Sequence, residues 1–413
     1  MTLDTGQCPK WLFERMVKLG REMCQILIAE YGPDEFVRRM SDPVWFQTLG
    51  TVLAFDWNAS GLTTILTAAL KESIRGYERD LGVFICGGKG KTSRKTPDEI
   101  SRWGEVLDFT PTETRALQYN SRMSAKVDSS LVQDGFQIYH HSFIFSKNGA
   151  WATVQQGMNT KAGAARRYHW FSPSVDGARI NADDTQKDAE KNAEGKIKIP
   201  RNSASCLRVS ALRHNFINEP HQGIASPIIL DHVLNLTASD SDKTRDLSTE
   251  FVAAGFQSIK KDIEILRKHS SALSKMISIR QGGEQLTFAK FENTEFHYHP
   301  VVKEDFSKSK YLEKISARLT EEKPKNYESL IATPGVGPKT VRALALVAEV
   351  IYGAKPSYTD PARYSFAHGG KDATPYPVDR ETYDKTIEML AAAVRKTHIS
   401  PNDKNKALRR LHP

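Results

Sequence analysis

Apolar side chains recur at helical spacing near the start of the chain. Between residues 9 and 31 they stand three or four positions apart, and Gly32-Pro33-Asp34 follows. This pattern predicts an amphipathic helix that ends near residue 31. Residues 61–77 show the same period and follow Ser60, a favourable N-cap residue, so they predict a second helix.

A different pattern predicts strands in the middle of the chain. Residues 81–86 are a short apolar stretch that runs into an expected glycine-rich turn, Gly87-Gly88-Lys89-Gly90. Residues 137–145 and 151–156 predict the two strands of a β-hairpin, because the Asn148-Gly149 pair between them is a strong turn signal.

The second half of the chain is predicted to be mostly helical, over residues 249–280, 312–319, 325–352 and 380–396. Residues 172–205 have few large apolar side chains and alternating charges, which is typical of a polar insertion or linker. We therefore expect an α+β protein: a mixed α/β N-terminal half with a β-hairpin, and a mostly α-helical C-terminal half that contains a helix-hairpin-helix. The expected domains are a base-recognition and catalytic domain (1–171), an insertion or linker (172–205), a mostly helical domain (206–325) and a DNA-binding region with a basic tail (326–413).

Composition narrows the classes of protein. The 413 residues include 58 Lys and Arg against 49 Asp and Glu, an excess of positive charge that suits a polyanionic partner. The four cysteines form no CxxC pair, which disfavours a zinc ribbon or a disulfide framework. No apolar run approaches the roughly 18–20 residues that span a bilayer, and the first residues lack the layout of a signal peptide. We expect a cytoplasmic protein that does not bind membranes; the oligomeric state stays open.

The strongest motif lies in residues 327–352, YESLIATPGVGPKTVRALALVAEVIY, which predict a helix-hairpin-helix. Glycines at the bend allow a tight turn and bring backbone N–H groups close to a phosphate, and the second helix directs its positive N-terminal end there. A proline suits the first position of that helix. The residues expected to bind the DNA backbone are Gly335, Val336, Gly337, Lys339 and Thr340.

The Gly-Val-Gly-x-Lys-Thr sequence of this bend resembles the hairpin of the endonuclease-III-like DNA glycosylases. The resemblance implies that Lys339 attacks the sugar carbon and that the downstream Asp360 assists it. The alternatives are that Lys339 only contacts a phosphate and that Asp360 only caps a helix. The sequence lacks the four-cysteine cluster that is common in those enzymes.

Longer segments resemble a family described only as domain of unknown function seven-six-three. They include DPVWFQTLGTVLAFDWNASGLTT, CGGKGKTSRKTPDEI, VDSSLVQDGFQIYHH, WATVQQGMN and GVGPKTVRALALVAEVIYGAKPSYTDPARYSFAHGGKD. The family usually has His-Ser where this chain has Asn58-Ala59, so a role of that histidine does not carry over. The resemblance further implies a DNA glycosylase that acts on modified bases in phage defence.

The first half carries the other candidate site residues. A flipped base needs an aromatic ring to stack on and polar groups at its edge, and Trp57 and Asn58, beside Asp56, match this need. Asp128 and Asp134 lie near His140 and His141, and either carboxylate is a candidate to activate water or to bind a divalent metal. Neighbouring residues of a strand face opposite sides, so only one of the two histidines is expected to share a site with Asp128.

Further groups suit contact with DNA. Gly87–Thr92 is not a P-loop because Ile85 stands where that motif needs glycine, but the segment is expected to bind phosphate through Lys89, Lys91, Arg94 and Lys95. Farther along are amides for base edges and a basic-aromatic cluster: Gln155, Gln156, Arg166, Arg167, Tyr168 and His169. His297 and His299 have the spacing of a metal-binding pair on a strand, although such pairs are more often structural.

These residues favour a DNA glycosylase that removes a modified base, for example a hypermodified or glucosylated cytosine of phage DNA, by base flipping. Either an aspartate-activated water or Lys339 would break the bond, with DNA as the partner and no cofactor. The first alternative is a DNA endonuclease with a divalent metal held by Asp56, Asp128, Asp134 and His140. The second is a DNA-binding protein without catalysis.

Overall fold

The computed structural model describes residues 8–53, 60–172, 214–218, 221–255, 261, 278–281, 284–287, 310–362 and 380–411. Almost all of the expected insertion, the His297–His299 pair and the segment with Asp56, Trp57 and Asn58 lie outside these residues. The helix expected over 249–280 is only partly described. Its last residues belong instead to strand β8 (Ser278–Gln281), which pairs with β9 (Glu284–Thr287), so this end of the predicted helix is wrong.

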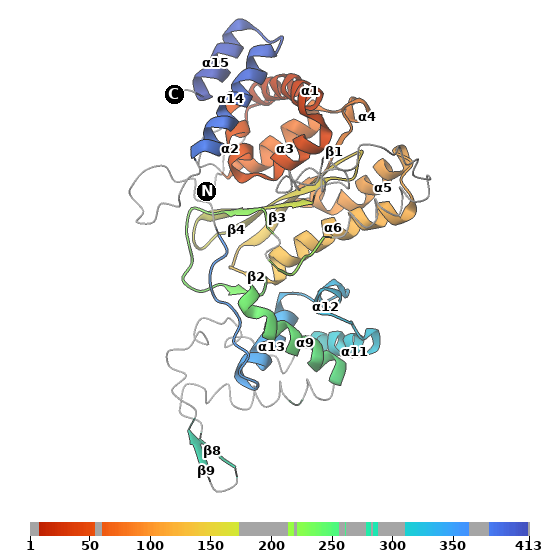
Figure 1. The fold of residues 1–413 in the computed structure, drawn as a ribbon, viewed down its shortest axis with the longest axis vertical. Coiled ribbons are helices and arrows are strands. Elements are labelled where there is room, and N and C mark those ends of the chain that lie inside the picture. Colours follow the sequence, from red (N-terminus) through yellow and green to blue (C-terminus); the bar gives the residue numbers. More distant parts are fainter. Residues whose placement is uncertain are drawn as a thin grey trace, which may run out of the picture.

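A five-stranded antiparallel sheet runs through the middle of the molecule (Figure 1). Its order is β1 (Val83–Lys89), β3 (Gln137–Ser146), β4 (Trp151–Asn159), β5 (Ala164–Ser172) and β6 (Gly223–Ala225). The predicted hairpin joins β3 to β4, and Gly149 has the positive φ of 97° that its turn requires. Gly87 and Gly88 lie within strand β1 and not in a turn, so the expected turn after residue 86 is wrong.

Helices cover both faces of the sheet. One face packs against α1 (Lys10–Ser41), α2 (Pro43–Val52), α3 (Gly61–Ser73) and the short α4 (Glu78–Leu81). The other packs against α5 (Thr96–Val106) and α6 (Pro111–Ser130), which follow a 3-10 helix, η1 (Gly90–Lys95). The first helix does not end at residue 31 as predicted. The chain bends at Gly32, where φ is 83°, and helical structure resumes beyond it.

The hairpin helices α12 (Tyr327–Ala332) and α13 (Pro338–Val350) form a lower group with α9 (Asp242–Ala254) and α11 (Lys310–Glu322) (Figure 1). A two-stranded ribbon of β2 (Val132–Gln133) and β7 (Leu234–Asn235), together with the 3-10 helix η2 (Ser239–Ser241), lies between this group and the sheet. The last helices, α14 (Arg380–Lys396) and α15 (Pro401–Leu411), return to α1 and α2. They share one buried core with the N-terminal helices and not with the hairpin, with which the expected boundaries grouped them. The predicted α+β class is confirmed.

Candidate functional site

The hairpin has the local geometry that its sequence predicts. Asn326 caps α12 by accepting from the backbone N–H of Ser329 at 2.8 Å, and Ser329 returns a bond to the Asn326 backbone. At the bend, Gly335 has a φ of 94°, a conformation that side chains with a Cβ rarely adopt, whereas Gly337 is extended at −144°. Val336 is buried between the two helices, so the bend is held by its own apolar core.

Side chains from the rest of the molecule hold the bend in place. Lys126 on α6 donates to the Thr333 carbonyl at 2.9 Å, and burial lowers the pKa of its amine to about 8. Gln133 at the end of β2 donates to the Pro338 carbonyl at 3.0 Å and accepts from Arg342 Nε at 2.6 Å. The hairpin is therefore attached to the β2–β3 connection, which leads directly into the sheet.

The expected hairpin residues differ in exposure. Lys339, in the first turn of α13, is exposed, whereas Thr340 is 2% exposed and belongs to the interior. The Lys339 ammonium is thus at the surface, where it is accessible to a phosphate or a sugar of a bound DNA strand.

Asp360 is engaged in a buried ion pair. Its two carboxylate oxygens accept from Arg166 Nη1 and Nη2 at 2.9 and 2.7 Å, and also from the backbone N–H groups of Ala362 and Leu230 at 3.0 and 2.8 Å. Arg166 Nη1 also donates to Asp134 at 3.0 Å. Because both oxygens of Asp360 are occupied in this way, the geometry favours an anchoring role for this residue over assistance to Lys339.

The sheet is polar at one end and apolar at the other. The polar end is formed by the last residues of β1 and β4 and the first residues of β3 and β5, next to the β2–β3 connection that holds the hairpin. Two rows of paired residues cross it: Gly88, His141, Gln155 and Tyr168, and Lys89, His140, Gln156 and Arg167. The first row carries side chains on the face toward α6, and the second on the face toward α3.

Asp128 is the centre of the network on the α6 face. This carboxylate projects from α6, is fully buried, and accepts a hydrogen bond from Trp170 Nε1 at 3.0 Å. The same oxygen accepts from the Gln155 amide, and the other oxygen contacts His221 Nε2. These three contacts hold the buried carboxylate in one orientation.

The direction of each bond behind Asp128 follows from the chemistry of the groups. Gln155 Nε2 donates to Asp128, so its Oε1 accepts, and the 2.9 Å contact with His141 Nδ1 requires a proton on that nitrogen. His141 is neutral because burial lowers its pKa, so its Nε2 is left to accept from Ser121 Oγ at 2.8 Å. A directed chain of bonds thus runs from Ser121 to Asp128 and fixes the carboxylate in place.

His221 was not among the residues singled out from the sequence. It lies 93 positions from Asp128, and its ring centroid is 4.6 Å from that of Trp170 and 6.1 Å from that of Tyr168. No local spacing relates these residues, because a strand, a helix and a connecting segment bring them together. A histidine next to a carboxylate is a common arrangement for proton transfer.

The α3 face carries a second buried network. Arg167 donates from Nε to His169 Nε2 at 2.8 Å and from Nη2 to Gln47 Oε1 at 3.1 Å. Burial lowers the pKa of the Arg167 guanidinium to about 9. Among the described residues, His140 Nδ1 and Gln156 Oε1 are buried polar atoms without a hydrogen-bond partner. Arg166 and Arg167 are both fully buried, so neither guanidinium is placed for direct contact with a DNA phosphate.

Of the expected nuclease ligands, the three that the structure describes, Asp128, Asp134 and His140, are not brought together. His140 bonds Thr67 on the α3 face, whereas Asp128 lies on the α6 face, where it is joined to His141 through Gln155. Asp134 is occupied by Arg166 and by the Tyr168 hydroxyl, which donates to it at 2.6 Å. Within the described part of the chain, no group of three or more His, Cys, Asp or Glu side chains has the arrangement of a metal site.

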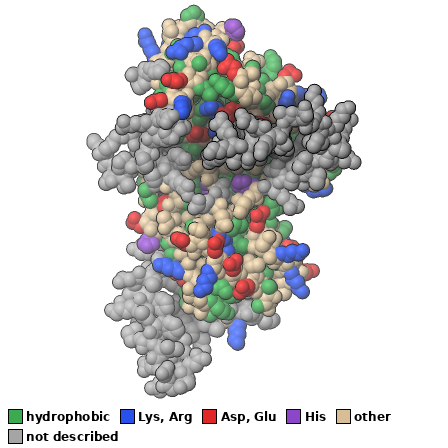
Figure 2. All heavy atoms as spheres, viewed as in Figure 1, with side chains coloured by type: hydrophobic (Ala, Val, Ile, Leu, Met, Phe, Trp, Pro, Cys, Tyr) green, Lys and Arg blue, Asp and Glu red, His purple; other side chains and the backbone are tan. Residues whose placement is uncertain are grey.

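The basic segment formed by the last residue of β1 and by η1 reaches the surface at the polar end. Lys89, Lys91, Arg94 and Lys95 are all exposed, and Lys89 Nζ lies 6.0 Å from the centre of the Tyr139 ring. Gly87 is fixed by Glu99, which accepts from its backbone N–H at 2.7 Å. On the face shown in Figure 2, basic and acidic side chains are intermingled, so that face shows no patch of one sign.

The buried histidines predict a loss of stability in acid. Burial lowers the pKa of His140 to about 3, and the pKa values of His141 and His169 are also lowered. An unfolded histidine has a pKa near 6.5, so the unfolded chain binds more protons below that pH, and stability falls as the pH drops from about 6.5 toward 3. For His140, a folded-state pKa of about 3 corresponds to a loss of about 1.4 kcal/mol at pH 5.5. Urea unfolding at pH 7.5 and 5.5 should show this loss of unfolding free energy. The loss should be smaller in the His140→Gln variant by the contribution of His140. An identical pH dependence in the variant would contradict the assignment.

Among the described residues, no helix is long and apolar enough to cross a membrane. No curated protein and no solved structure matches the chain. One family model does match, over residues 1–208 and 206–378, and its description is "Protein of unknown function (DUF763)". These two ranges cover nearly the whole chain and include α6, the sheet and the hairpin. The chain therefore belongs to the DUF763 family.

Proposed function

We propose that this protein is a DNA glycosylase that hydrolyses the bond between a modified base and its sugar. The observation that carries the proposal is the attachment of the hairpin to the polar end of the sheet. Gln133 donates a hydrogen bond to the carbonyl of Pro338, the first residue of α13. Asp134, which follows Gln133 in the chain, accepts a hydrogen bond from the Tyr168 hydroxyl. The Tyr168 ring lies next to His221, which contacts Asp128. A DNA strand bound at the hairpin would thus lie beside a buried carboxylate–histidine pair.

The pair suits activation of water. In this mechanism His221 donates its Nε2 proton to Asp128, which leaves Nδ1 with the lone pair that accepts a proton from water. The oxygen of that water then bonds to the sugar carbon C1′, the bond to the base breaks, and the base leaves with the bonding electrons and takes up a proton. The products are a free base and an abasic site. Trp170 and Tyr168 flank the histidine and exclude solvent around it.

An excision assay tests this function. Duplexes that each carry one modified base, including hydroxymethylated and glucosylated cytosine, are incubated with the protein, with and without chelator, and then treated with alkali. We expect strand breaks only after alkali, at the same level with chelator. Breaks without alkali that chelator abolishes would indicate a nuclease, and binding without breaks would indicate a non-catalytic DNA-binding protein. Borohydride trapping tests Lys339: a covalent adduct that Lys339→Ala abolishes would assign the attack to that lysine instead of water.

The two hairpin glycines predict different effects. Gly335→Ala should lower stability because a Cβ is strained at a φ of 94°. Gly337→Ala should leave stability unchanged, because its backbone is extended and a Cβ would meet nothing within 4 Å. If the bend approaches a phosphate closely, Gly337→Ala should nevertheless weaken DNA binding about tenfold, which corresponds to about 1.4 kcal/mol. Unfolding curves and fluorescence anisotropy with a labelled duplex measure both. Unchanged affinity in both variants would refute phosphate binding by the bend.

A further inference from the structure

The last two helices, α14 and α15, lie at the end of the molecule opposite the hairpin helices, with the sheet between the two ends (Figure 1). They pack against each other and against α2, and they share the buried core of the N-terminal helices. Lys404 Nζ donates to the Arg395 carbonyl at 2.9 Å, and Arg410 Nη1 donates to the Val52 carbonyl at 3.2 Å. The two helices are therefore fixed to the N-terminal half, on the side of the sheet that faces away from α6.

This end of the chain carries an excess of positive charge. Residues 395–411 contain one acidic residue, Asp403, and six basic residues: Arg395, Lys396, Lys404, Lys406, Arg409 and Arg410. Lys396 pairs with Glu30, and Asp403 accepts from the Ser400 hydroxyl at 2.8 Å. The side-chain bonds of Lys404 and Arg410 go to carbonyl groups, which carry no net charge. Apart from Lys396, these cations therefore have no carboxylate partner among the described residues.

The acidic side chains near these helices form no ion pair with the cations of α15, as far as the described residues extend. The helix α2, which packs against α15, has no charged residue. On α1, Glu22 accepts from the backbone N–H of His398 at 3.3 Å. On α14, Asp384 and Glu388 are exposed, and about two turns of helix or more separate them from Arg395. The cations of α15 are therefore not neutralised by ion pairs with its neighbouring helices.

The exposed face of α15 is mainly polar. The exposed side chains that recur three or four positions apart, and so lie along one side of the helix, are Asn402, Asn405, Lys406 and Arg409. All four can donate hydrogen bonds to a phosphate oxygen. A helix that lies on a membrane needs an apolar face toward the lipid, whereas Ala407 and Leu411 of α15 are buried in the core. A row of unpaired cations without apolar neighbours favours a polyanionic partner over a lipid surface.

We propose that the exposed face of α15 binds the phosphate backbone of DNA, as a second contact that is separate from the hairpin. Lys406 and Arg409 would neutralise phosphates and release their counterions, and the two asparagines would donate to phosphate oxygens. Phosphate contacts carry no sequence information, so this contact is independent of the DNA sequence. It goes beyond base excision, because it requires neither the bend of the hairpin nor the Asp128–His221 pair.

The test is the salt dependence of DNA affinity in the full chain, measured by fluorescence anisotropy with a labelled duplex at about 50 to 200 mM salt. The double variant Lys406→Gln/Arg409→Gln should bind at least tenfold more weakly at the low-salt end. Its slope of log affinity against log salt should be smaller by about 2, because each phosphate contact contributes about 0.9. Both side chains are exposed, so urea unfolding should be unchanged. The charge-conserving variant Lys406→Arg/Arg409→Lys should keep the slope of the parent.

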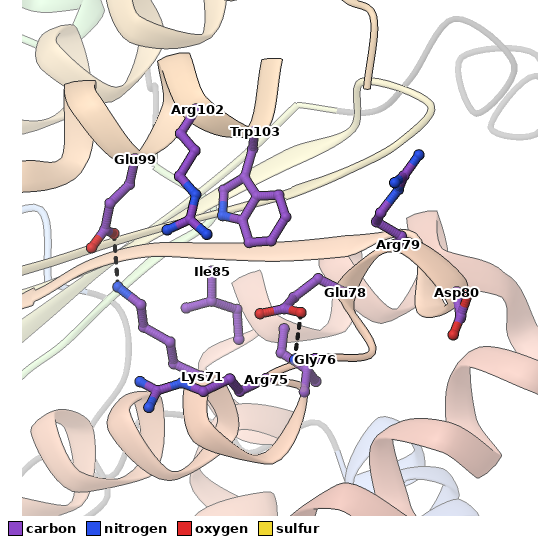
Figure 3. Close-up of a pocket in the computed structure, with 11 residues that line it drawn as sticks. Lys71, Arg75, Gly76, Glu78, Arg79, Asp80, Ile85, Glu99, Arg102 and Trp103 are labelled. Atoms are coloured by element: carbon purple, nitrogen blue, oxygen red, sulfur yellow. Dashed lines mark hydrogen bonds and ion pairs between the residues drawn. The ribbon is translucent and has the colours of Figure 1, made fainter. Parts of the chain in front are cut away.

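The matched control is Arg79→Gln/Arg102→Gln, which removes the same charge from exposed residues elsewhere. These arginines line a cleft between α3–α4 and α5, where the acidic Glu78 and Asp80 lie among them (Figure 3). Because cations and carboxylates are interspersed there, the control should leave the salt slope unchanged. Equal slopes in this control and in Lys406→Gln/Arg409→Gln would overturn the inference.

Two further measurements separate this contact from other kinds of binding. Gly337→Ala should weaken DNA binding without changing the slope, because backbone N–H groups carry no charge that would release counterions. The slope therefore tests α15 whether or not the bend binds DNA. Anionic vesicles of phosphatidylserine and phosphatidylcholine should bind no better to the parent than to Lys406→Gln/Arg409→Gln. Vesicle binding that this variant abolishes, or no binding of the duplex at about 50 mM salt, would contradict a DNA contact on α15.

Discussion

Replacing Asp128 by asparagine is expected to lower the rate of base excision about a thousand- to ten-thousand-fold. The asparagine oxygen still accepts from Trp170 and Gln155, so the packing is kept. Its amide group, however, now directs hydrogens toward His221 Nε2, which shifts the histidine proton to Nδ1. The nitrogen that should accept a proton from water then carries one already. Single-turnover excision on the best substrate of the assay measures the rate.

The control is Asp240→Asn, which makes the same chemical change at an exposed position of η2 and should leave the rate unchanged. DNA affinity should be the same in both variants and in the parent, because the Asp128 carboxylate is buried and does not reach the DNA backbone. A fully active Asp128→Asn variant with unchanged stability would remove this carboxylate from the mechanism and leave its network a purely structural role.

Replacing Arg166 by methionine is expected to cost about 3–5 kcal/mol of unfolding free energy. All five N–H groups of this guanidinium are used: Nε bonds Ser226, and the two Nη atoms bond Asp134, Asp360 and the Ile228 carbonyl. The variant leaves two carboxylates buried without their cation, which is more costly than losing a surface ion pair. Urea unfolding measures the loss.

Two further measurements separate this explanation from a simple packing defect. Arg94→Met, at an exposed position in η1, should change stability by less than about 0.5 kcal/mol. Burial already raises the pKa of Asp134 beside Arg166, and loss of the cation should raise it further. An acid with a raised pKa in the folded state becomes less destabilising as it is protonated, so the deficit of Arg166→Met should shrink as the pH is lowered. A deficit that does not vary with pH would argue for packing alone.

Local sequence signals predicted the local structure well. The helix expected over residues 380–396 has these bounds in the structure, and the β3–β4 hairpin and the helix-hairpin-helix formed where their turn residues lie. In each case the deciding information lies within a few neighbouring residues, as a cap, a glycine or a period of apolar positions. Gly32 shows the limit of such signals: the sequence predicted a stop, but packing of the residues beyond it retains helical structure after the bend.

The candidate site needed information that no local pattern contains. The sequence indicated Asp128 as a possible general base, but its three donors come from two strands and from His221, after β5. The sequence also grouped His140 with Asp128. In the structure, the register of β3 pairs His141 with Gln155, so His141 and not His140 is joined to the Asp128 network. Strand register is set by the pairing of whole strands. The residues adjacent in sequence to a polar side chain therefore do not determine on which face of the sheet it lies.

The return of α14 and α15 to the first helices has a consequence for how the chain acquires its structure. Lys396 pairs with Glu30 and Arg410 donates to the Val52 carbonyl at 3.2 Å, although these partners are 366 and 358 positions apart. Contacts between such distant segments form slowly, because a long loop must close before they are gained. During synthesis, α1 and α2 leave the ribosome long before α14 and α15, so the part of their apolar surface that these two helices cover stays open until both have been made. This part of the N-terminal core is therefore completed only when the last described helices have formed.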